Sequence, residues 1–146
     1  MAPFGIRLAR LLLPIGLGLF SFAGTAAAAG TGGAGSRPKT IASYCSPSGD
    51  VCIGIVSRSG AVYLELSTAA HYFDRYRLCV RPPGGGAGAL VRCGSFPVVR
   101  RGSSWGSSVR YARQYPVIGP GSYLVTWKLG EKPLGPTLRF RLPLTR

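Results

Sequence analysis

The sequence predicts an all-β protein, an antiparallel sandwich of about seven strands that carries two disulfides, with a closed small barrel as the alternative. Short stretches in which apolar and polar residues alternate are separated by turn residues, the pattern of strands with one face in a core and one in water. No stretch repeats its apolar residues with the 3.6-residue period of a helix. The length of 146 residues suits one domain, or one domain preceded by a removable leader.

The first 29 residues have the layout of a secretory signal peptide. Arg7 and Arg10 form a basic start, residues 11–23 are apolar, and small residues up to Ala29 supply an Ala-x-Ala cleavage pattern. The apolar run is shorter than the ~20 residues of a membrane-spanning helix, and it contains Pro14. We therefore expect export, with the mature chain extracellular or periplasmic and without a transmembrane segment.

Residues 30–40 consist mainly of Gly and other small or polar residues without periodicity, so a flexible arm is predicted there, followed by the domain over residues 41–146. The clearest alternation of apolar and polar residues covers residues 62–67, 75–81, 123–129 and 138–142. Weaker strand candidates are residues 52–57, 90–99 and 107–111. Residues 68–74 fit either a single helical turn or a connection between strands.

Four cysteines in an exported chain are expected to pair, and three connectivities are open. We favour Cys45 with Cys52 and Cys79 with Cys93, because each pair brackets a turn-rich segment and so joins two chain-adjacent strands. A zinc site is the alternative. The paired short spacings of structural zinc sites are absent, and one histidine does not complete such a ligand set.

The stretch Ile118-Gly119-Pro120-Gly121-Ser122-Tyr123-Leu124-Val125 resembles the segment before the penultimate strand of fibronectin-type and other immunoglobulin-like domains. In those domains a Tyr follows a turn, and its hydroxyl bonds back to the backbone as a tyrosine corner. The resemblance implies an immunoglobulin-like sandwich in which Tyr123 has that structural role. Trp127 is expected to be a second structural residue, on the apolar side of the same strand.

The end of the chain is also similar to that of periplasmic copper-resistance chaperones, which are exported immunoglobulin-like sandwiches. The similarity lies in residues 121–127 and in Thr137-Leu138-Arg139-Phe140 after a Gly-Pro turn. Copper binding in that family needs several histidines, whereas this chain has only His71, and its only Met is Met1. The resemblance therefore implies the fold, and no copper site is expected.

Positive charge dominates the composition, with 18 Lys and Arg against 4 Asp and Glu and a formal net charge of +14. If the apolar residues of each strand face the core, one strand presents Arg75, Arg77 and Arg81 on its outer side. The last strand presents Arg139 and Arg141 in the same way. These five arginines form the predicted polyanion-binding set.

Such a surface attracts anionic polymers of the cell envelope or the extracellular space, such as wall teichoic acid, acidic polysaccharide, lipid headgroups or extracellular nucleic acid. The chain carries no motif for specific nucleic-acid recognition. Tyr63, Tyr72, Trp105 and Tyr115 are expected to add stacking surface. The simpler interpretation, which the sequence leaves open, is that arginine only keeps solvent faces and edge strands soluble.

Few side chains are available for catalysis or metal binding. Outside cysteine the inventory is Asp50, Glu65, Asp74, Glu131 and His71. No motif supports a Glu65–His71 acid–base pair, and no Gly-x-Ser-x-Gly nucleophile turn is present. The glycine-rich run at residues 84–88 lacks the Lys-Ser/Thr ending of a phosphate-binding loop and is expected to be a hairpin tip. We predict a non-catalytic protein without metal or cofactor.

The sequence thus predicts an exported binding or adhesion module whose basic face meets an anionic polymer. A second interpretation is a small secreted inhibitor of an extracellular enzyme. Its recognition element would be the loop from Ser46 to Val51, which a Cys45–Cys52 bridge pre-orders, lowering the entropy cost of binding a protein partner. A degenerate copper-chaperone-like domain is the third.

Overall fold

The computed structural model describes residues 37–84 and 90–144. Within them the elements are β1 (Lys39–Cys45), β2 (Val51–Arg58), β3 (Ala61–Thr68), β4 (Arg75–Arg81), β5 (Arg92–Pro97), β6 (Val99–Arg101), β7 (Ser104–Arg110), α1 (Tyr111–Gln114), β8 (Gly121–Leu129), β9 (Lys132–Pro133) and β10 (Leu138–Leu142). The predicted signal peptide lies outside the described residues, as do residues 30–36 of the predicted arm and residues 85–88 of the predicted hairpin tip.

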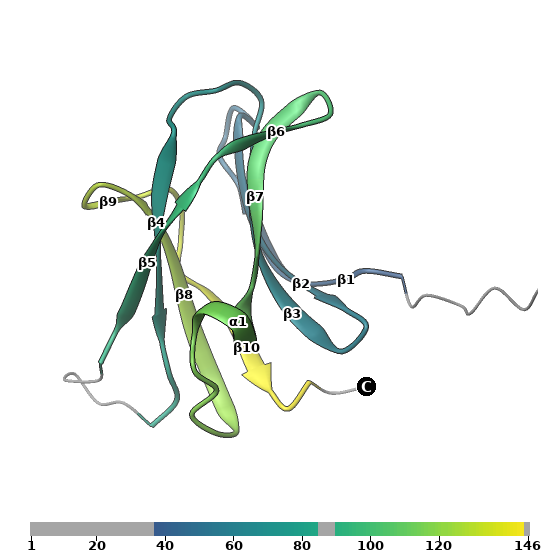
Figure 1. Ribbon diagram of the computed structural model, residues 1–146, viewed down its shortest axis with the longest axis vertical. Coiled ribbons are helices and arrows are strands. Elements are labelled where there is room, and N and C mark those ends of the chain that lie inside the picture. Colours follow the sequence, from purple (N-terminus) through teal and green to yellow (C-terminus); the bar gives the residue numbers. More distant parts are fainter. Residues whose placement is uncertain (1–36, 85–89, 145–146) are drawn as a thin grey trace, which may run out of the picture. The chain divides into compact units, whose positions relative to one another are not determined.

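The strands form two antiparallel sheets (Figure 1). One has the order β1-β2-β3-β7-β6, and the other has the order β10-β8-β4-β5 with β9 paired to β8. Immunoglobulin sheets have the orders A-B-E-D and G-F-C, with C′ beside C. Strands β2-β3-β7-β6 follow the first order and β10-β8-β4-β5 the second, while β1 is an added outer strand. The predicted antiparallel immunoglobulin-like sandwich is confirmed.

Three local features differ from the prediction. β1 begins at Lys39, inside the range predicted as a flexible arm. The single strand predicted at residues 90–99 is two strands in different sheets, because the chain crosses between them at the buried Val98, whose N–H donates to the Asp74 carbonyl at 2.8 Å. The helix α1 begins at Tyr111, which the prediction included in a strand candidate. Of the two possibilities predicted for residues 68–74, the structure has the connection between strands, at residues 69–74.

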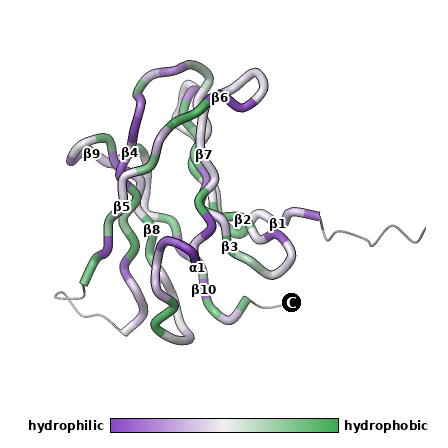
Figure 2. Tube along the Cα trace, in the orientation of Figure 1, coloured by the Kyte–Doolittle hydropathy of each residue, from purple (hydrophilic) through white to green (hydrophobic). Residues whose placement is uncertain are grey.

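The core lies between the sheets and is filled by the inward residues of both. The side chains with less than 2 % of their surface exposed are Trp127, Tyr76, Tyr111, Tyr123, Phe140, Ile55, Leu64, Leu66, Leu78, Val125 and Thr68. Figure 2 shows hydrophobic and hydrophilic residues interleaved along the strands, as one-sided burial requires. Trp127 is 0 % exposed and its indole nitrogen has no hydrogen-bond partner among the described residues, so it fills the core as an apolar group.

Both disulfides have the predicted pairing. Cys45 lies directly opposite Cys52 on β1 and β2, and Cys79 lies opposite Cys93 on β4 and β5. The Cα–Cα distance is 4.0 Å in each pair. Each bridge therefore joins two neighbouring strands of one sheet. The part of the chain that the structure describes has no free cysteine.

Tyr123 fixes the turn that precedes β8. Its hydroxyl donates to the Gly119 carbonyl at 2.6 Å and accepts from the N–H groups of Ile118 and Gly119, both at 3.2 Å. The ring is fully buried and stacks on Phe140, with 5.1 Å between the ring centroids. This geometry is the tyrosine corner expected from the Gly-Pro-Gly turn.

The substitution Tyr123→Phe is expected to lower the free energy of unfolding by about 1–3 kcal/mol, because it removes one donor and leaves two backbone N–H groups without their acceptor. Chemical denaturation measures this change. Tyr63→Phe is the matched control, since the Tyr63 hydroxyl forms no hydrogen bond to other described residues and its ring is only half-buried. Equal stability of the two variants would contradict a stabilising corner.

A second buried hydroxyl joins the two sheets. Tyr76 of β4 hydrogen-bonds Ser107 of β7 through their hydroxyl groups, and both residues are buried. Burial raises the pKa of Tyr76 from 10.0 to about 12, although the bond from Ser107 and the charge of Arg101 act in the opposite direction. Burial also raises the pKa of Tyr115, whose hydroxyl donates to the Leu78 carbonyl at 2.6 Å.

The raised pKa of Tyr76 predicts alkaline destabilisation. Below pH 10 the phenol is neutral in both the folded and the unfolded chain; between pH 10 and about 12 it ionises mainly in the unfolded chain. The free energy of unfolding is therefore expected to fall by up to about 1.4 kcal/mol per pH unit in this window on account of Tyr76. Tyr76→Phe should flatten this dependence, whereas Tyr72→Phe, at an exposed ring, should not; equal slopes in both variants would refute the assignment.

Candidate functional site

The outer face of the β10-β8-β4-β5 sheet gathers basic side chains. The inward alternation of Tyr76, Leu78 and Val80 turns the neighbouring arginines of β4 outward, and the same holds on β10 around Phe140. The basic residues of this face are Arg75, Arg77 and Arg81 of β4, Lys128 of β8, and Arg139 and Arg141 of β10. The structure thus brings all five arginines of the predicted set onto one face and adds Lys128. We call these six residues the basic face.

The register places the basic residues in rows across the sheet. Arg139 and Arg81 both lie beside Leu124, from β10 on one side and β4 on the other. At the opposite end of the sheet, Arg77 lies beside Lys128. The first row belongs to the start of β8 and the second to its end.

The two ends differ in how their charge is compensated. Glu131, in the turn after β8, lies 2.5 Å from Arg77 and 3.7 Å from Lys128, so it neutralises that end. Arg75 is held by Ser95, to whose hydroxyl and carbonyl it donates at 3.1 and 3.0 Å. The charge of the basic face is therefore least compensated at the end where β10 carries its arginines.

The remaining carboxylates do not reach that end. All four Asp and Glu of the chain lie among the described residues, and the ones in ion pairs other than Glu131 are Glu65 with Arg58 and Asp74 with His71. Within residues 37–84 and 90–144, Arg81, Arg139 and Arg141 form no ion pair and no side-chain hydrogen bond. These three arginines are available to an external anion.

A hollow of about 340 Å³ opens on the basic face at this end. Its lining residues are Cys79, Arg81, Val91, Leu124, Thr126, Thr137 and Arg139. The hydroxyls of Thr126 and Thr137 lie 2.9 Å apart. Neither this hollow nor Lys128 belongs to the predicted site. Alternation along β8 places Lys128 outward, whereas the meeting of the two threonines depends on the β8–β10 register.

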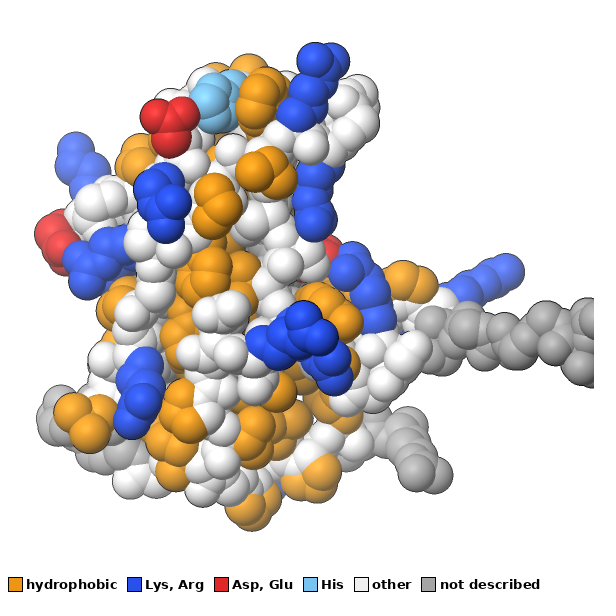
Figure 3. All heavy atoms as spheres, in the orientation of Figure 1, with side chains coloured by type: hydrophobic (Ala, Val, Ile, Leu, Met, Phe, Trp, Pro, Cys, Tyr) orange, Lys and Arg blue, Asp and Glu red, His pale blue; other side chains and the backbone are white. Residues whose placement is uncertain are grey.

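The outer face of the other sheet is chemically different. There Glu65 binds both Arg58 and the hydroxyl of Ser108, and the Arg58 guanidinium lies 5.1 Å from the centre of the Tyr63 ring. Figure 3 shows a third side of the molecule, where β5 of one sheet and β6 and β7 of the other lie, with hydrophobic side chains in the middle and Lys and Arg around them. Basic residues are thus widespread, but Arg58 is paired with Glu65.

The aromatic residues predicted as stacking surface are dispersed. Tyr115 is buried, with only 5 % of its surface exposed, which corrects the prediction that it lies on the surface; α1 turns it back into the core beside Tyr111. Tyr72 is exposed, and Trp105 stacks on His71. The outward positions of β4, β5, β8 and β10 carry no aromatic side chain.

His71 lies in the connection between β3 and β4. Its Nε2 is 3.2 Å from a carboxylate oxygen of Asp74, and its ring stacks on Trp105 with 4.2 Å between centroids. Glu65 has different partners, so the structure does not join Glu65 and His71 in one pair. Across the described ranges, no three His, Cys, Asp or Glu side chains come together as a metal site.

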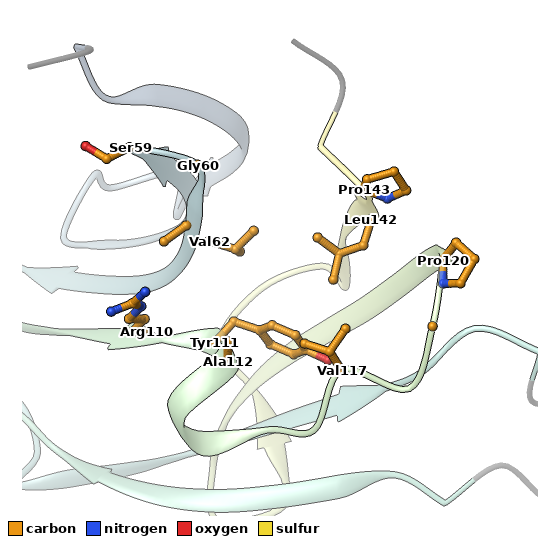
Figure 4. Close-up of a pocket in the computed structure, with 12 residues that line it drawn as sticks. Ser59, Gly60, Val62, Arg110, Tyr111, Ala112, Val117, Pro120, Leu142 and Pro143 are labelled. Carbon is orange, nitrogen blue, oxygen red and sulfur yellow. The ribbon is translucent and has the colours of Figure 1, made fainter.

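An apolar hollow of about 610 Å³ lies at one end of the sandwich (Figure 4). Figure 4 shows Val62, Tyr111, Val117 and Leu142 around it, contributed by β3, α1, the loop before β8 and β10. Arg110 is the one charged residue of its lining. The hollow has the composition of an apolar contact surface.

Comparison of the chain with family models, with curated proteins and with solved structures gives no match. Of the described residues, no helix has the length and apolar character needed to cross a membrane. Functional inference therefore depends on the geometry and charge of the surfaces.

Proposed function

We propose that the protein is a secreted, non-catalytic binding module whose basic face attaches to anionic polymers of the cell envelope or the extracellular space. The observation that carries the proposal is the grouping of Arg81, Arg139 and Arg141 on one face without an acidic partner among the described residues. A polyanion binds such a surface by releasing its condensed counterions. The two disulfides and the N-terminal signal-like segment support an extracellular or periplasmic location.

The arrangement favours binding over a purely solubilising role. Arg81, Arg139 and Arg141 carry like charges on one face with only β8 between their strands, and such a concentration of one sign of charge is self-repelling. Solubility alone is served better by charges of both signs interspersed over the surface. A polyanion relieves the repulsion, so binding offsets a cost that the free protein bears.

The proposal is tested by mixing the protein with purified cell envelope, and separately with soluble polyanions of different chemistry, at low salt. Co-sedimentation measures the first and fluorescence anisotropy of a labelled polymer measures the second. We expect binding in both. A protein that stays in solution and leaves the anisotropy unchanged would overturn the proposal.

The Cys45–Cys52 loop supports the second candidate function, inhibition of an extracellular enzyme. The loop is internally ordered, because the Ser46 N–H donates to the Val51 carbonyl and the Gly49 N–H donates to the Ser46 carbonyl, both at 2.8 Å. Such an ordered, mostly exposed loop loses little entropy when it enters a protein partner. Replacing Ser46 and Ser48 with Ala should abolish inhibition of such an enzyme and leave polyanion binding unchanged.

A further inference from the structure

The hollow on the basic face has the chemistry of a site for one anionic group. Its polar lining consists of two guanidinium groups and two hydroxyls, and it contains no carboxylate. We propose that it binds a single phosphate or sulfate monoester, carried on a sugar-sized unit. The inference rests on the proposed function and deepens it, since it names the group of the polymer that the protein recognises.

The register sets the spacing of the two arginines. Arg81 and Arg139 lie two strands apart with Leu124 between them. Neighbouring strands are separated by about 4.7–4.9 Å, so the two Cα atoms are about 10 Å apart. That separation lets two guanidinium groups approach one anion from opposite sides above Leu124. Neither guanidinium forms an ion pair with a carboxylate of the described residues.

The threonine pair supplies a further donor. Because the Thr126 and Thr137 hydroxyls are 2.9 Å apart, one of them donates its hydrogen to the other. The second hydroxyl keeps its own hydrogen, which is then available to a ligand. Thr126 lies two residues after Leu124 and therefore on the same side of β8.

The number and direction of the hydrogen-bond donors in the hollow favour one class of anion over another. Two guanidinium forks and one hydroxyl offer about five hydrogens to a bound group. A carboxylate has two oxygens with about four acceptor sites in one plane, whereas a phosphate monoester has three strong acceptor oxygens in a tetrahedral arrangement. A sulfate monoester shares that arrangement of terminal oxygens. Two guanidinium groups that approach from opposite sides, with a hydroxyl on the sheet surface beneath the anion, fit the tetrahedral group best.

Two further observations narrow the class of molecule that carries the anionic group. A volume of about 340 Å³ is near the lower end of small-ligand sites, so the hollow suits one sugar-sized unit. The surrounding outward positions of β4, β5, β8 and β10 carry no aromatic side chain, whereas binding of single-stranded nucleic acid depends on aromatic stacking. These features favour a phosphorylated or sulfated glycan over nucleic acid.

The test uses three probes that differ in the anionic group on one sugar: glucose 6-phosphate, glucose 6-sulfate and glucuronate. Binding to the protein is followed by amide and guanidinium NMR shifts at moderate salt. We expect the phosphate, the sulfate or both to bind at least about tenfold more tightly than glucuronate, with shifts at Thr126 and at the two arginines. The phosphate and sulfate arms identify which ester the site prefers.

Three variants separate the hollow from the general charge of the face. The double variant Arg81→Gln with Arg139→Gln is expected to weaken binding of the preferred probe at least about tenfold. The double variant Arg75→Gln with Arg141→Gln removes the same amount of charge outside the hollow, and it should weaken binding of that probe less than about threefold. Thr126→Val with Thr137→Val changes no charge, and it should weaken binding of the probe several-fold because the site loses its hydroxyl donor.

The outcomes distinguish this inference from the proposed function. Equal losses in the two arginine pairs, or glucuronate binding as tightly as both esters, would overturn the hollow as a site and leave the basic face as a general polyanion surface. Absence of polyanion binding by the unaltered protein would overturn the proposed function and this inference together. Each variant is checked by thermal unfolding, and the threonine pair keeps the test valid if an arginine pair fails to fold.

Discussion

Replacing Arg81, Arg139 and Arg141 together with Gln is expected to weaken binding to a soluble polyanion about 100- to 1,000-fold at about 0.05 M salt. Each cation that contacts an anionic group releases about one counterion, which is worth about a factor of ten in affinity at that salt. These arginines have no acidic partner among the described residues, so no internal ion pair has to be broken for them to bind. Glutamine keeps much of the aliphatic stem and its packing.

The control removes the same charge elsewhere. Arg100 and Arg101 on β6 and Arg113 on α1 are exposed and belong to other surfaces. Changing these three to Gln should lower the affinity less than about tenfold, through the smaller overall field alone. If both triple variants lose affinity equally, net charge rather than the basic face determines binding.

Reducing both disulfides is expected to lower the free energy of unfolding by about 5 kcal/mol. The bridges close loops with sequence separations of 7 and 14 residues. In the chain-entropy model these loops contribute about 2 and about 3 kcal/mol respectively. A loss of this size is comparable to the whole stability of many small domains, so the reduced protein should be marginally folded at ambient temperature.

Paired serine variants separate the two contributions. Cys79→Ser with Cys93→Ser should cost about 3 kcal/mol and Cys45→Ser with Cys52→Ser about 2 kcal/mol in denaturant unfolding. Because β1 is an outer strand, loss of its bridge should free β1 first, which hydrogen exchange of its amides would detect. Unchanged stability after reduction would mean that the bridges do not constrain the unfolded chain.

Period-two alternation was enough to predict four of the strands, since each strong run is a strand in the structure: β3, β4, β8 and β10. Alternation did not predict β1, because a register irregularity between Thr40 and Ala42 interrupts the alternation there. The prediction of one strand over residues 90–99 overlooked Pro97, which has no N–H for a strand ladder and directly precedes the crossing between the sheets at Val98. The helix of residues 111–114 is too short to display a period.

The candidate site was predictable only in part. Alternation alone placed the five arginines on outer faces, but which of them are neutralised depends on the turn that brings Glu131 to Arg77 and Lys128. The hollow depends on pairing between β8 and β10, which sets Thr137 against Thr126. Register between distant strands is a tertiary property, and a single sequence does not specify it locally.

The most direct test of the central claim is a salt titration of polyanion binding, from about 0.02 to about 0.5 M, with several chemically different polymers. We predict that the logarithm of the association constant falls linearly with the logarithm of salt concentration, with a slope of magnitude about 3 or more that is shared among the polymers. The triple variant of Arg81, Arg139 and Arg141 should lose about 2–3 units of that slope. Absence of binding at the lowest salt, or an affinity that does not change with salt, would contradict the account.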